Sequence, residues 1–369
     1  MIFENEEELF SRMALSLVDG IGPHTSKNLI AYCGSAKEVF RQKNAVLKKI
    51  PEIGKVRADA IKAFDNFIRV EKELDFIQKN QIEALSFTSP RYPERLRQCY
   101  DCPIVIYRKG PIDLNSKRMI AIVGTRYATS YGKKLTQEFV EELKGMNVVV
   151  ASGLAYGTDI NAQKACINSD IPTLAVLAHG LDIIYPKVHQ RYADQMLTHG
   201  GWLTEYMSGT TPDRENFPKR NRIIAGICDV VLVVEATNKG GALITAEYAN
   251  SYNRDVLAIP GDLHSKLSEG CNTLIKSHKA ALVQSVKDIR YVMNWDAEVK
   301  RPMIQQSIFH PTSKSEQLVF DYLNSNGKTG LDELSVRTEV SSGELVSLLL
   351  GLELNGIVKS SPGKLYEIV

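Results

Sequence analysis

A short run at residues 212–224, PDRENFPKRNRII, carries the side chains best suited to chemistry in this chain. Four of them are cationic: Arg214, Lys219, Arg220 and Arg222. They surround one aromatic residue, Phe217, and only Asp213 and Glu215 oppose their charge. Guanidinium groups can grip phosphate oxygens through paired hydrogen bonds, and an aromatic ring can stack on a base. The run therefore predicts a surface that binds single-stranded nucleic acid, and not a catalytic centre.

Three glycine-containing loops offer a second set of candidate contacts: GTR at 124–126, SGLAYGTD at 152–159 and KGGA at 239–242. Glycine lets a phosphate approach the backbone closely, and a helix that follows such a loop favours anions at its first turn. The candidate residues in these loops are Gly124, Arg126, Ser152, Gly153, Lys239, Gly240 and Gly241. Neither GxGxxG nor GxxxxGK[ST] occurs in the chain, which disfavours a nucleotide cofactor.

The elements that must position these loops alternate between apolar strands and amphipathic helices. Strands are predicted at 119–123, 148–151, 173–177, 202–205, 229–235 and 256–260, and helices near 131–145, 158–168, 188–198 and 241–252. This alternation is typical of a mainly parallel sheet with helices on both faces. Ligands of such sheets bind beyond the carboxyl ends of the strands, where the three loops are expected.

Residues 1–88 predict a helical domain with two related glycine turns, one around Gly22 and one around Gly54. Each turn precedes a helical pattern, which resembles a tandem helix-hairpin-helix (SAM-like) domain. Backbone N–H groups at such a turn can bind phosphate. The segment has 13 basic and 13 acidic residues, however, so packing against the neighbouring domain is an equally good interpretation.

The C-terminal part predicts a linker at 296–312 and a winged-helix domain at 313–369, with helices near 315–325, 331–338 and 342–355 and a final hairpin. The third helix, SGELVSLLLGLELNG, carries glutamates and neither lysine nor arginine. Phosphates would repel such a helix from duplex DNA, which favours a protein-contact or structural role.

Composition narrows the possible classes of ligand and the kind of protein that this chain can be. The predicted central domain, with its linker, holds 27 basic against 22 acidic residues, so it is the segment that favours a polyanion. No stretch has the roughly 20 consecutive apolar residues that a membrane span needs. The six cysteines are scattered, and Cys99 and Cys102 form the one CxxC pair, without a second pair or a histidine cluster. We therefore expect a reduced, cytoplasmic protein without a metal site.

From about Phe87 to Ile289 the chain resembles the bacterial DNA-processing protein A family, also called DprA or Smf. The motifs that carry the resemblance are IAIVGTR (120–126), SGLAYGTD (152–159), VLAHGLDIIYP (176–186), NFPKRNRIIAG (216–226), VVEATNKGGALITAEYA (233–249), AIPGD (258–262) and GCNTLI (270–275). The resemblance implies a multidomain α/β protein with a Rossmann-like domain at 89–295, between the helix-hairpin-helix and winged-helix domains.

The resemblance also implies a function. Family members bind single-stranded DNA, protect it during natural transformation and help load a RecA-type recombinase, as homodimers formed through the Rossmann-like domain. It implies no enzyme activity and no cofactor. Arg126 and the turn at Ser152 and Gly153 would hold phosphate, and Phe217 would stack on a base. Arg214 stands where the family often has lysine, and Arg220, Asn221 and Arg222 match its RNR.

Two departures and several alternatives accompany this resemblance. Gln163 replaces a histidine found in many members, and Gly241 replaces a serine. Asn221 and Asp159 could instead cap helices or tie loops together, and Arg222 could be the buried partner of an acid such as Asp229. The alternative function is an enzyme that processes a nucleotide or its phosphoribosyl group, for which the candidate acids and bases are Asp159, Glu205 and His179.

Overall fold

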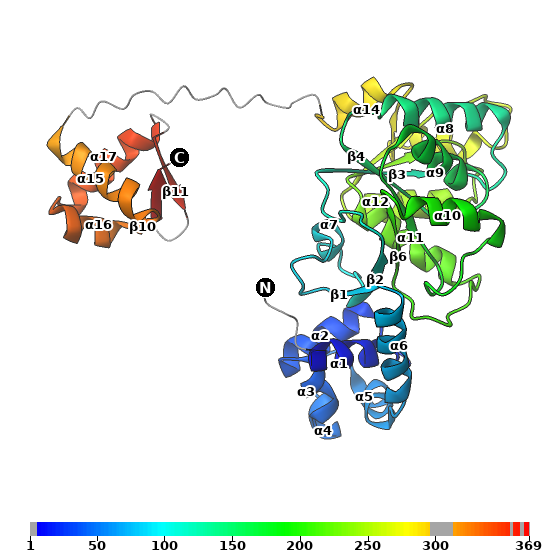
Figure 1. Ribbon diagram of the computed structural model, residues 1–369, viewed down its shortest axis with the longest axis horizontal. Helices are drawn as coiled ribbons and strands as arrows, with labels where there is room; N and C mark the ends of the chain where they lie inside the picture. The colour runs from blue at the N-terminus through cyan, green and yellow to red at the C-terminus, as the bar shows by residue number, and fades with distance from the viewer. Residues whose placement is uncertain (1–5, 296–312, 355–356, 362–364, 369) are drawn as a thin grey trace. The chain divides into compact units, whose positions relative to one another are not determined.

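The computed structural model describes residues 6–295, 313–354, 357–361 and 365–368 (Figure 1). They fall into two compact units, Met1–Trp295 and Asp296–Val369. The predicted linker at 296–312 lies outside the described residues. No helix in the described ranges is long and apolar enough to cross a membrane.

The first unit is built on a sheet of nine strands in the order β1-β2-β6-β5-β4-β3-β7-β8-β9. Its strands are β1 Glu83–Ser86, β2 Val105–Lys109, β3 Arg118–Val123, β4 Val148–Ser152, β5 Thr173–Val176, β6 Gly201–Thr204, β7 Val230–Val233, β8 Asp255–Ala258 and β9 Ala281–Leu282. From β6 to β9 all neighbours are parallel, whereas β2 pairs antiparallel with β6, and β1 with β2. The predicted mainly parallel sheet is confirmed.

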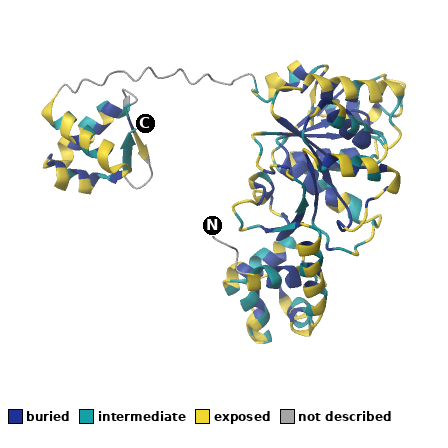
Figure 2. Ribbon diagram, in the orientation of Figure 1, coloured by how far each residue is buried: buried dark blue, intermediate teal, exposed yellow. Residues whose placement is uncertain are grey.

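Helices cover both faces of this sheet. They are α7 Glu94–Arg97, α8 Ser130–Glu142, α9 Thr158–Ser169, the 3-10 turn η1 Lys187–His189, α10 Gln190–Met196, α11 Asn216–Ile227, α12 Gly241–Ser251, α13 Glu269–Lys276 and α14 Val286–Val292. Side chains alternate between two cores: Met119 and Ala121 of β3 pack with α11 and α12, and Ile120 and Ile122 with α8, α9 and α14. This period of two, with both faces buried, is why the strands are almost wholly apolar (Figure 2).

The direction of the chain reverses between β3 and β7. After β3 the strands run outward through β4 and β5 to β6, and the chain then returns to place β7 on the other side of β3. At such a switch point the loops that follow the two central strands turn apart and leave a crevice. The loop after β3 begins at Gly124, and the loop after β7 leads to Gly240 and Gly241. The fold thus puts two of the three predicted glycine loops at one position.

The N-terminal segment consists of six helices: α1 Glu6–Ser16, α2 Pro23–Cys33, α3 Ala36–Arg41, α4 Asn44–Leu47, α5 Gly54–Ala63 and α6 Phe67–Lys79. Both predicted glycine turns are present, because Gly22 precedes α2 and Gly54 begins α5 with a φ of 61°. The helices share a hydrophobic core with β2, β5 and β6. The packing interpretation of this segment is thus supported, while the helix-hairpin-helix assignment and the 88/89 boundary stay predictions.

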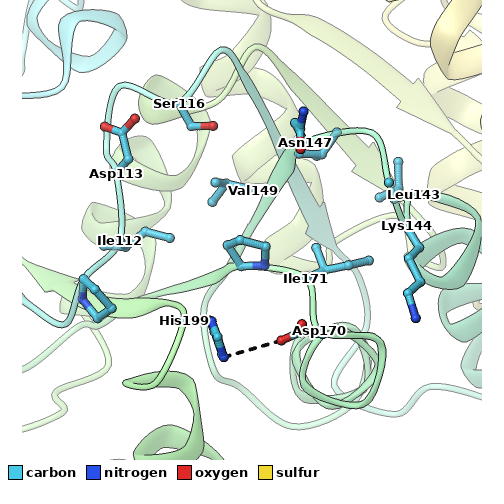
Figure 3. A pocket seen from close by; sticks show the side chains of 14 residues that line it. Ile112, Asp113, Ser116, Leu143, Lys144, Asn147, Val149, Asp170, Ile171 and His199 are labelled. Carbon is cyan, nitrogen blue, oxygen red and sulfur yellow. Dashed lines mark ion pairs between the residues drawn. The ribbon is translucent and has the colours of Figure 1, made fainter.

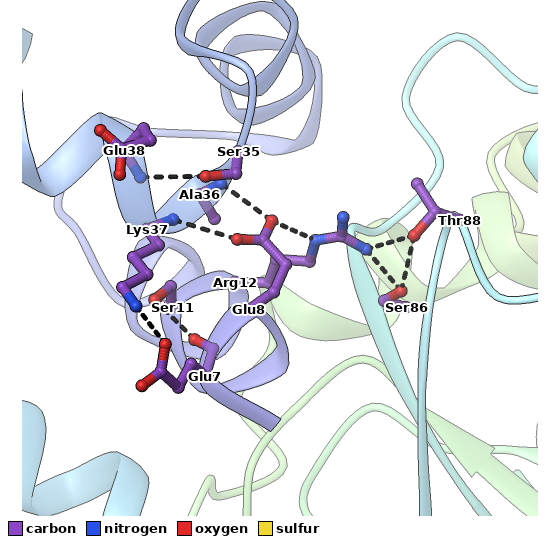
Figure 4. Close-up of polar contacts among 10 residues, drawn as sticks. All are labelled: Glu7, Glu8, Ser11, Arg12, Ser35, Ala36, Lys37, Glu38, Ser86 and Thr88. Atoms are coloured by element: carbon purple, nitrogen blue, oxygen red, sulfur yellow. Dashed lines mark hydrogen bonds and ion pairs between the residues drawn. The ribbon is translucent and has the colours of Figure 1, made fainter. Parts of the chain in front are cut away.

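Arg12 of α1 fixes these helices to the sheet (Figure 4). Its guanidinium donates to Glu8 Oε1 at 2.9 Å on its own helix, and to Ser86 Oγ at 2.6 Å and Thr88 Oγ1 at 2.5 Å at the end of β1. It also lies 5.1 Å from the ring centroid of Phe87. A buried cation with this set of partners ties the position of α1 to the first strand.

Within its described residues, the second unit has three helices and a small sheet: α15 Lys314–Asn326, β10 Thr329–Gly330, α16 Leu331–Thr338, α17 Ser342–Leu354, β11 Val358–Ser361 and β12 Leu365–Ile368. The hairpin of β11 and β12 is antiparallel, and β12 also pairs with β10. Its core includes Val319, Leu334 and Leu349, one residue from each helix. The predicted winged-helix arrangement is confirmed.

Replacement of Arg12 tests how the N-terminal helices are held. Arg12→Ala leaves Glu8 without its cation and removes the guanidinium that donates to Ser86 and Thr88. We therefore expect a loss of about 3–5 kcal/mol in the free energy of unfolding. Urea denaturation followed by circular dichroism measures this. The matched control is Arg41→Ala, because its pair with Glu38 is solvent-exposed and should contribute at most about 1 kcal/mol. Equal losses in the two variants would contradict the role given to Arg12.

Candidate nucleic-acid interface

A hollow of about 860 Å³ lies at the switch point of the sheet. It is lined by the loop after β3, the loop after β7, the first turns of α11 and α12 and the start of α9. Of the predicted site residues it contains Gly124, Arg126, Arg214, Phe217, Arg220, Asn221, Gly240 and Gly241. Residues from three separate parts of the sequence thus meet at the carboxyl ends of β3 and β7.

Close contact between the loops after β3 and β4 requires glycine at two positions. Gly157 has a φ of 76°, and a Cβ there would lie 2.1 Å from the Thr125 carbonyl oxygen. A Cβ on Gly124 would lie 2.3 Å from the Thr158 hydroxyl. The Thr158 N–H donates to the Thr125 carbonyl at 3.1 Å, so the two loops are hydrogen-bonded where they touch. This contact sets the direction in which Arg126 leaves the sheet.

Arg220 lies under the hollow and joins α11 to two strand ends. Its guanidinium donates to the carbonyl of Gly153 at 2.8 Å and to that of Val176. A Cβ on Gly153 would lie 2.4 Å from the guanidinium, so the loop after β4 rests directly on it. Burial lowers the pKa of Arg220 to about 10, and the nearby Asp159 carboxylate opposes that shift. The side chain stays a cation at neutral pH.

Arg126 and Phe217 form the exposed part of the interface. The Arg126 guanidinium lies 5.2 Å from the ring centroid of Phe217, a cation–π contact between the loop after β3 and the first turn of α11. Arg126 and Arg214 are both exposed. A positive charge and an aromatic ring therefore stand side by side at the opening of the hollow.

The first turn of α12 supplies backbone donors. Gly240 precedes this helix of eleven residues, and Gly241 begins it. The first N–H groups of a helix have no partner within the helix, and they favour an anion. The Asn221 side-chain amide donates to the Gly241 carbonyl at 3.2 Å, which ties α11 to α12. Asn221 thus holds a loop in place, as the alternative interpretation expected.

Some predicted site residues have structural contacts instead. Ser152 is fully buried, and its hydroxyl donates to the Ile122 carbonyl at 2.7 Å. Arg222 is also buried and has the acidic partner that the alternative interpretation expected, but the partner is Glu205. The proposed partner Asp229 was wrong, because it pairs with Arg95 at 2.5 Å.

Lys219 and Lys239 are both exposed beside the hollow but do not line it. Lys219 lies 3.8 Å from Glu215, the residue that precedes α11, and this pair is exposed to solvent. Such side chains can still contribute charge to the surroundings of the hollow.

Sequence reasoning missed three tyrosines at this site: Tyr127, Tyr156 and Tyr185. They line an adjoining hollow of about 510 Å³ together with Arg126, Gly153 and Phe217. Tyr127 directly follows the first glycine loop, and Tyr156 stands inside the second. An aromatic residue in a loop at the carboxyl end of a strand was the available signal.

The three candidate acids and bases of the enzyme alternative are engaged or buried. The Asp159 carboxylate accepts from the Gly153 N–H at 3.1 Å, and burial raises its pKa while Arg220 opposes that shift. His179 Nε2 accepts from the Tyr185 N–H at 3.3 Å, and burial lowers its pKa. Glu205 pairs with Arg222, as above. Over the described ranges, no three His, Cys, Asp or Glu residues gather in a way that could hold a metal ion.

A separate hollow of about 380 Å³ lies at the opposite ends of β4 and β5 (Figure 3). His199 and Asp170 face each other across it at 3.5 Å, and both side chains are largely exposed to solvent. Among the described residues that line it, none belongs to the predicted site. The predicted site residues that line a hollow therefore lie at the carboxyl ends of the strands and not at this one.

Comparison with known proteins agrees with this fold. The family model for DNA recombination-mediator protein A matches residues 83–294, and that for the DprA winged helix domain matches residues 310–364. Protein Smf of Synechocystis is 30% identical over 96% of this chain and 97% of its own.

Two solved structures are also similar. The structure of DNA processing protein A from Streptococcus pneumoniae has a TM-score of 0.67 at 30% identity, and covers 77% of this chain and 97% of its own. DNA processing protein A from Helicobacter pylori, whose structure was described for its single-stranded DNA binding mode, has a TM-score of 0.53 at 28% identity. That match covers 58% of this chain and 97% of the other.

Replacement of Arg222 distinguishes a structural from a binding role. Arg222→Ala leaves the Glu205 carboxylate largely buried and unpaired, so we expect a loss of about 3–5 kcal/mol in the free energy of unfolding. Chemical denaturation measures this directly. Arg214→Ala is the control, because that side chain is exposed and its loss should leave the stability almost unchanged. A stable Arg222→Ala protein would refute the structural assignment.

Proposed function

Because the chain belongs to the DNA recombination-mediator protein A family, we propose that it binds single-stranded DNA in the hollow at the switch point of its sheet. The observation that carries the proposal is the meeting of Arg126, Phe217 and the first turn of α12 in one hollow. Together they offer a charged fork, a stacking ring and backbone donors for an anion. The single-stranded DNA binding mode described for the Helicobacter pylori protein supports the same ligand.

Within this proposal the residues have different tasks. Arg126 and Arg214 bind phosphate oxygens, and Gly240 and Gly241 let a phosphate reach the backbone N–H groups of α12. Phe217 stacks on a base. Lys219 and Lys239 add positive charge beside the hollow, while Arg220 forms its floor and donates to the Gly153 carbonyl. Ser152, Asn221 and Arg222 hold the surrounding loops and helices, so their effect on DNA is indirect. Phosphate contacts carry no sequence information, and we expect little base preference.

We further propose that the chain binds DNA without catalysing a reaction on it. A general acid or base must reach the proton that it transfers, with a pKa suited to the task. Asp159 is only 8% exposed and lies beside Arg220, and His179 is 1% exposed. These positions support a role in holding loops.

Two finer parts of the role are proposals as well: homodimer formation through the Rossmann-like domain, and loading of a RecA-type recombinase on DNA in natural transformation. The outer edge of the sheet supports homodimer formation. There both residues of β9 are exposed, including the apolar Leu282. Tyr291, which follows in α14, is exposed as well. Sedimentation gives the mass of the particle, and recombinase filament growth on protein-coated DNA measures the loading.

Removal of the Arg126 charge tests the binding site. Arg126→Ala should weaken binding of a single-stranded oligonucleotide roughly tenfold, because one charge-assisted contact is lost. The slope of log affinity against log salt should also fall by about 0.7, the value for one phosphate on a single strand. Fluorescence anisotropy at several salt concentrations gives both numbers.

Lys134→Ala is the matched control, because Lys134 is exposed on α8 and does not line the hollow. It should bind as the unchanged protein does. If Arg126→Ala also bound with unchanged affinity and salt slope, the hollow would not be the DNA site.

A separate measurement tests the alternative that the protein is an enzyme acting on nucleotides. Incubation of the protein with mononucleotides should release neither base nor phosphate, as chromatography of the mixture would show. Turnover that Asp159→Asn abolishes, with the fold intact by circular dichroism, would replace the binding proposal with a catalytic one.

A further inference from the structure

An aromatic hollow adjoins the proposed phosphate site. Its volume is about 510 Å³, and its aromatic lining residues are Tyr127, Tyr156, Tyr185 and Phe217. The three tyrosines are 83%, 50% and 46% exposed. Large apolar surface that gathers around a hollow marks a site of interaction, whereas single exposed aromatics need no explanation. The hollow therefore requires a ligand that covers aromatic rings.

The rings are arranged so that their faces stay available. The centroids of Tyr185 and Phe217 are 6.0 Å apart, with their planes tilted by 52°. Because the planes are far from parallel, the two rings do not stack on each other, and each keeps a face that the other does not cover. A flat aromatic ligand can therefore lie against the Tyr185 ring, beside the Phe217 ring over which the Arg126 guanidinium lies.

Two buried histidines support this side of the hollow: one holds the backbone of Tyr185, and the other packs against the ring of Tyr156. The Tyr185 N–H donates to His179 Nε2 at 3.3 Å, and His179 Nδ1 lies 2.9 Å from the Gly180 carbonyl, to which it donates in this tautomer. Tyr156 packs edge-on against His189, with centroids 5.0 Å apart. His189 Nδ1 lies 2.8 Å from the Leu154 carbonyl. Less conformational freedom is then lost on binding, because the Tyr185 main chain and the Tyr156 ring are already held in place.

The aromatic hollow is continuous with the larger one, since Arg126, Tyr127, Ala155, Tyr185 and Phe217 line both. A ligand that fills both must carry an anionic group beside a flat aromatic group, repeated along its length. Single-stranded nucleic acid has this chemistry, because each phosphate is followed by a base with two π faces. Its bases also lack pairing partners, so their faces are available.

We propose that Tyr156 and Tyr185 form a second base-binding subsite, which takes an unstacked base next to the one held by Phe217. This inference rests on the proposed function, because it assumes that Arg126 binds the phosphate between the two. The glycine loops and arginines then hold the sugar–phosphate backbone, while the tyrosine side of the interface holds bases. Base stacking of this kind is tolerant of sequence.

The test compares two probes of equal length: oligo(dT), and an abasic oligonucleotide with the same phosphates and no bases. In the full chain, Tyr156→Leu together with Tyr185→Leu removes the π faces and keeps apolar volume. We expect binding of oligo(dT) to weaken roughly tenfold, as the loss of one stacked base implies. Binding of the abasic strand and the salt slope should not change. The double variant Tyr156→Phe with Tyr185→Phe keeps both rings and should bind oligo(dT) with unchanged affinity.

Two further variants complete the comparison. Tyr131→Leu is the matched control, because this exposed tyrosine at the start of α8 does not line the aromatic hollow. Phe217→Ala is the positive reference. We expect it to weaken binding of oligo(dT) about as much as the double leucine variant does.

The outcomes separate the two proposals. Unchanged oligo(dT) binding in the double leucine variant, with weakened binding in Arg126→Ala, overturns the second subsite and leaves the proposed function standing. An equal loss for oligo(dT) and the abasic strand also overturns it, since the tyrosines would then only support the fold. If Arg126→Ala has no effect on either probe, the proposed function itself fails.

Photocrosslinking gives an independent readout. An oligonucleotide with 5-iodouracil at each position in turn forms adducts with aromatic side chains that contact the base. We expect adducts on Tyr156 or Tyr185 in addition to Phe217, located by mass spectrometry of the digested protein. Adducts on Phe217 with neither tyrosine modified would contradict the inference.

Discussion

The contact between the buried Arg220 guanidinium and the main chain of Gly153 and Val176 is the constraint on which the rest of the interface depends. It brings α11 over the carboxyl ends of β4 and β5, with Asp159 beside it. A buried cation is tolerated only where acceptors surround it, so α11 can occupy this position and no other close by. Phe217 lies one helical turn before Arg220, and its place at the hollow follows from that anchor.

The interface then divides according to what each side can bind. On one side the loop after β3 and the first turn of α12 offer Arg126 and backbone donors, and on the other side the tyrosines offer ring faces. Glycine is needed where the loops touch, because a side chain at Gly157 would collide with the main chain of Thr125. The same close contacts that make the fold possible also border the hollow proposed for single-stranded DNA.

Much of the fold and of the candidate interface followed from local sequence patterns. Apolar runs that alternate with amphipathic helices predicted β3, β4, β5, β7 and β8, because strands buried on both faces must be apolar throughout. The motif NFPKRNRIIAG predicted a charged run with one aromatic ring, although the helix that carries it, α11, was not among the predicted helices. Most of the glycine loops lie where a parallel sheet requires them. The partner of Arg222 was missed, because Glu205 follows β6 and comes near α11 only after the sheet has formed. Ser152 was predicted to hold phosphate, but its buried hydroxyl donates to the Ile122 carbonyl, which comes near only when β3 and β4 pair.

The sequence by itself determined the parallel sheet, the winged helix, the family and the chemistry of the interface, since these depend on residue types and their periodicity. Only the tertiary structure decided which cations are available. Arg214, Arg220 and Arg222 stand within one short run, yet Arg214 precedes α11 and is exposed, whereas Arg220 and Arg222 lie on the helix and are buried. It also decided that Tyr156 and Tyr185 meet Phe217, because strand order brings together loops that lie far apart in the chain.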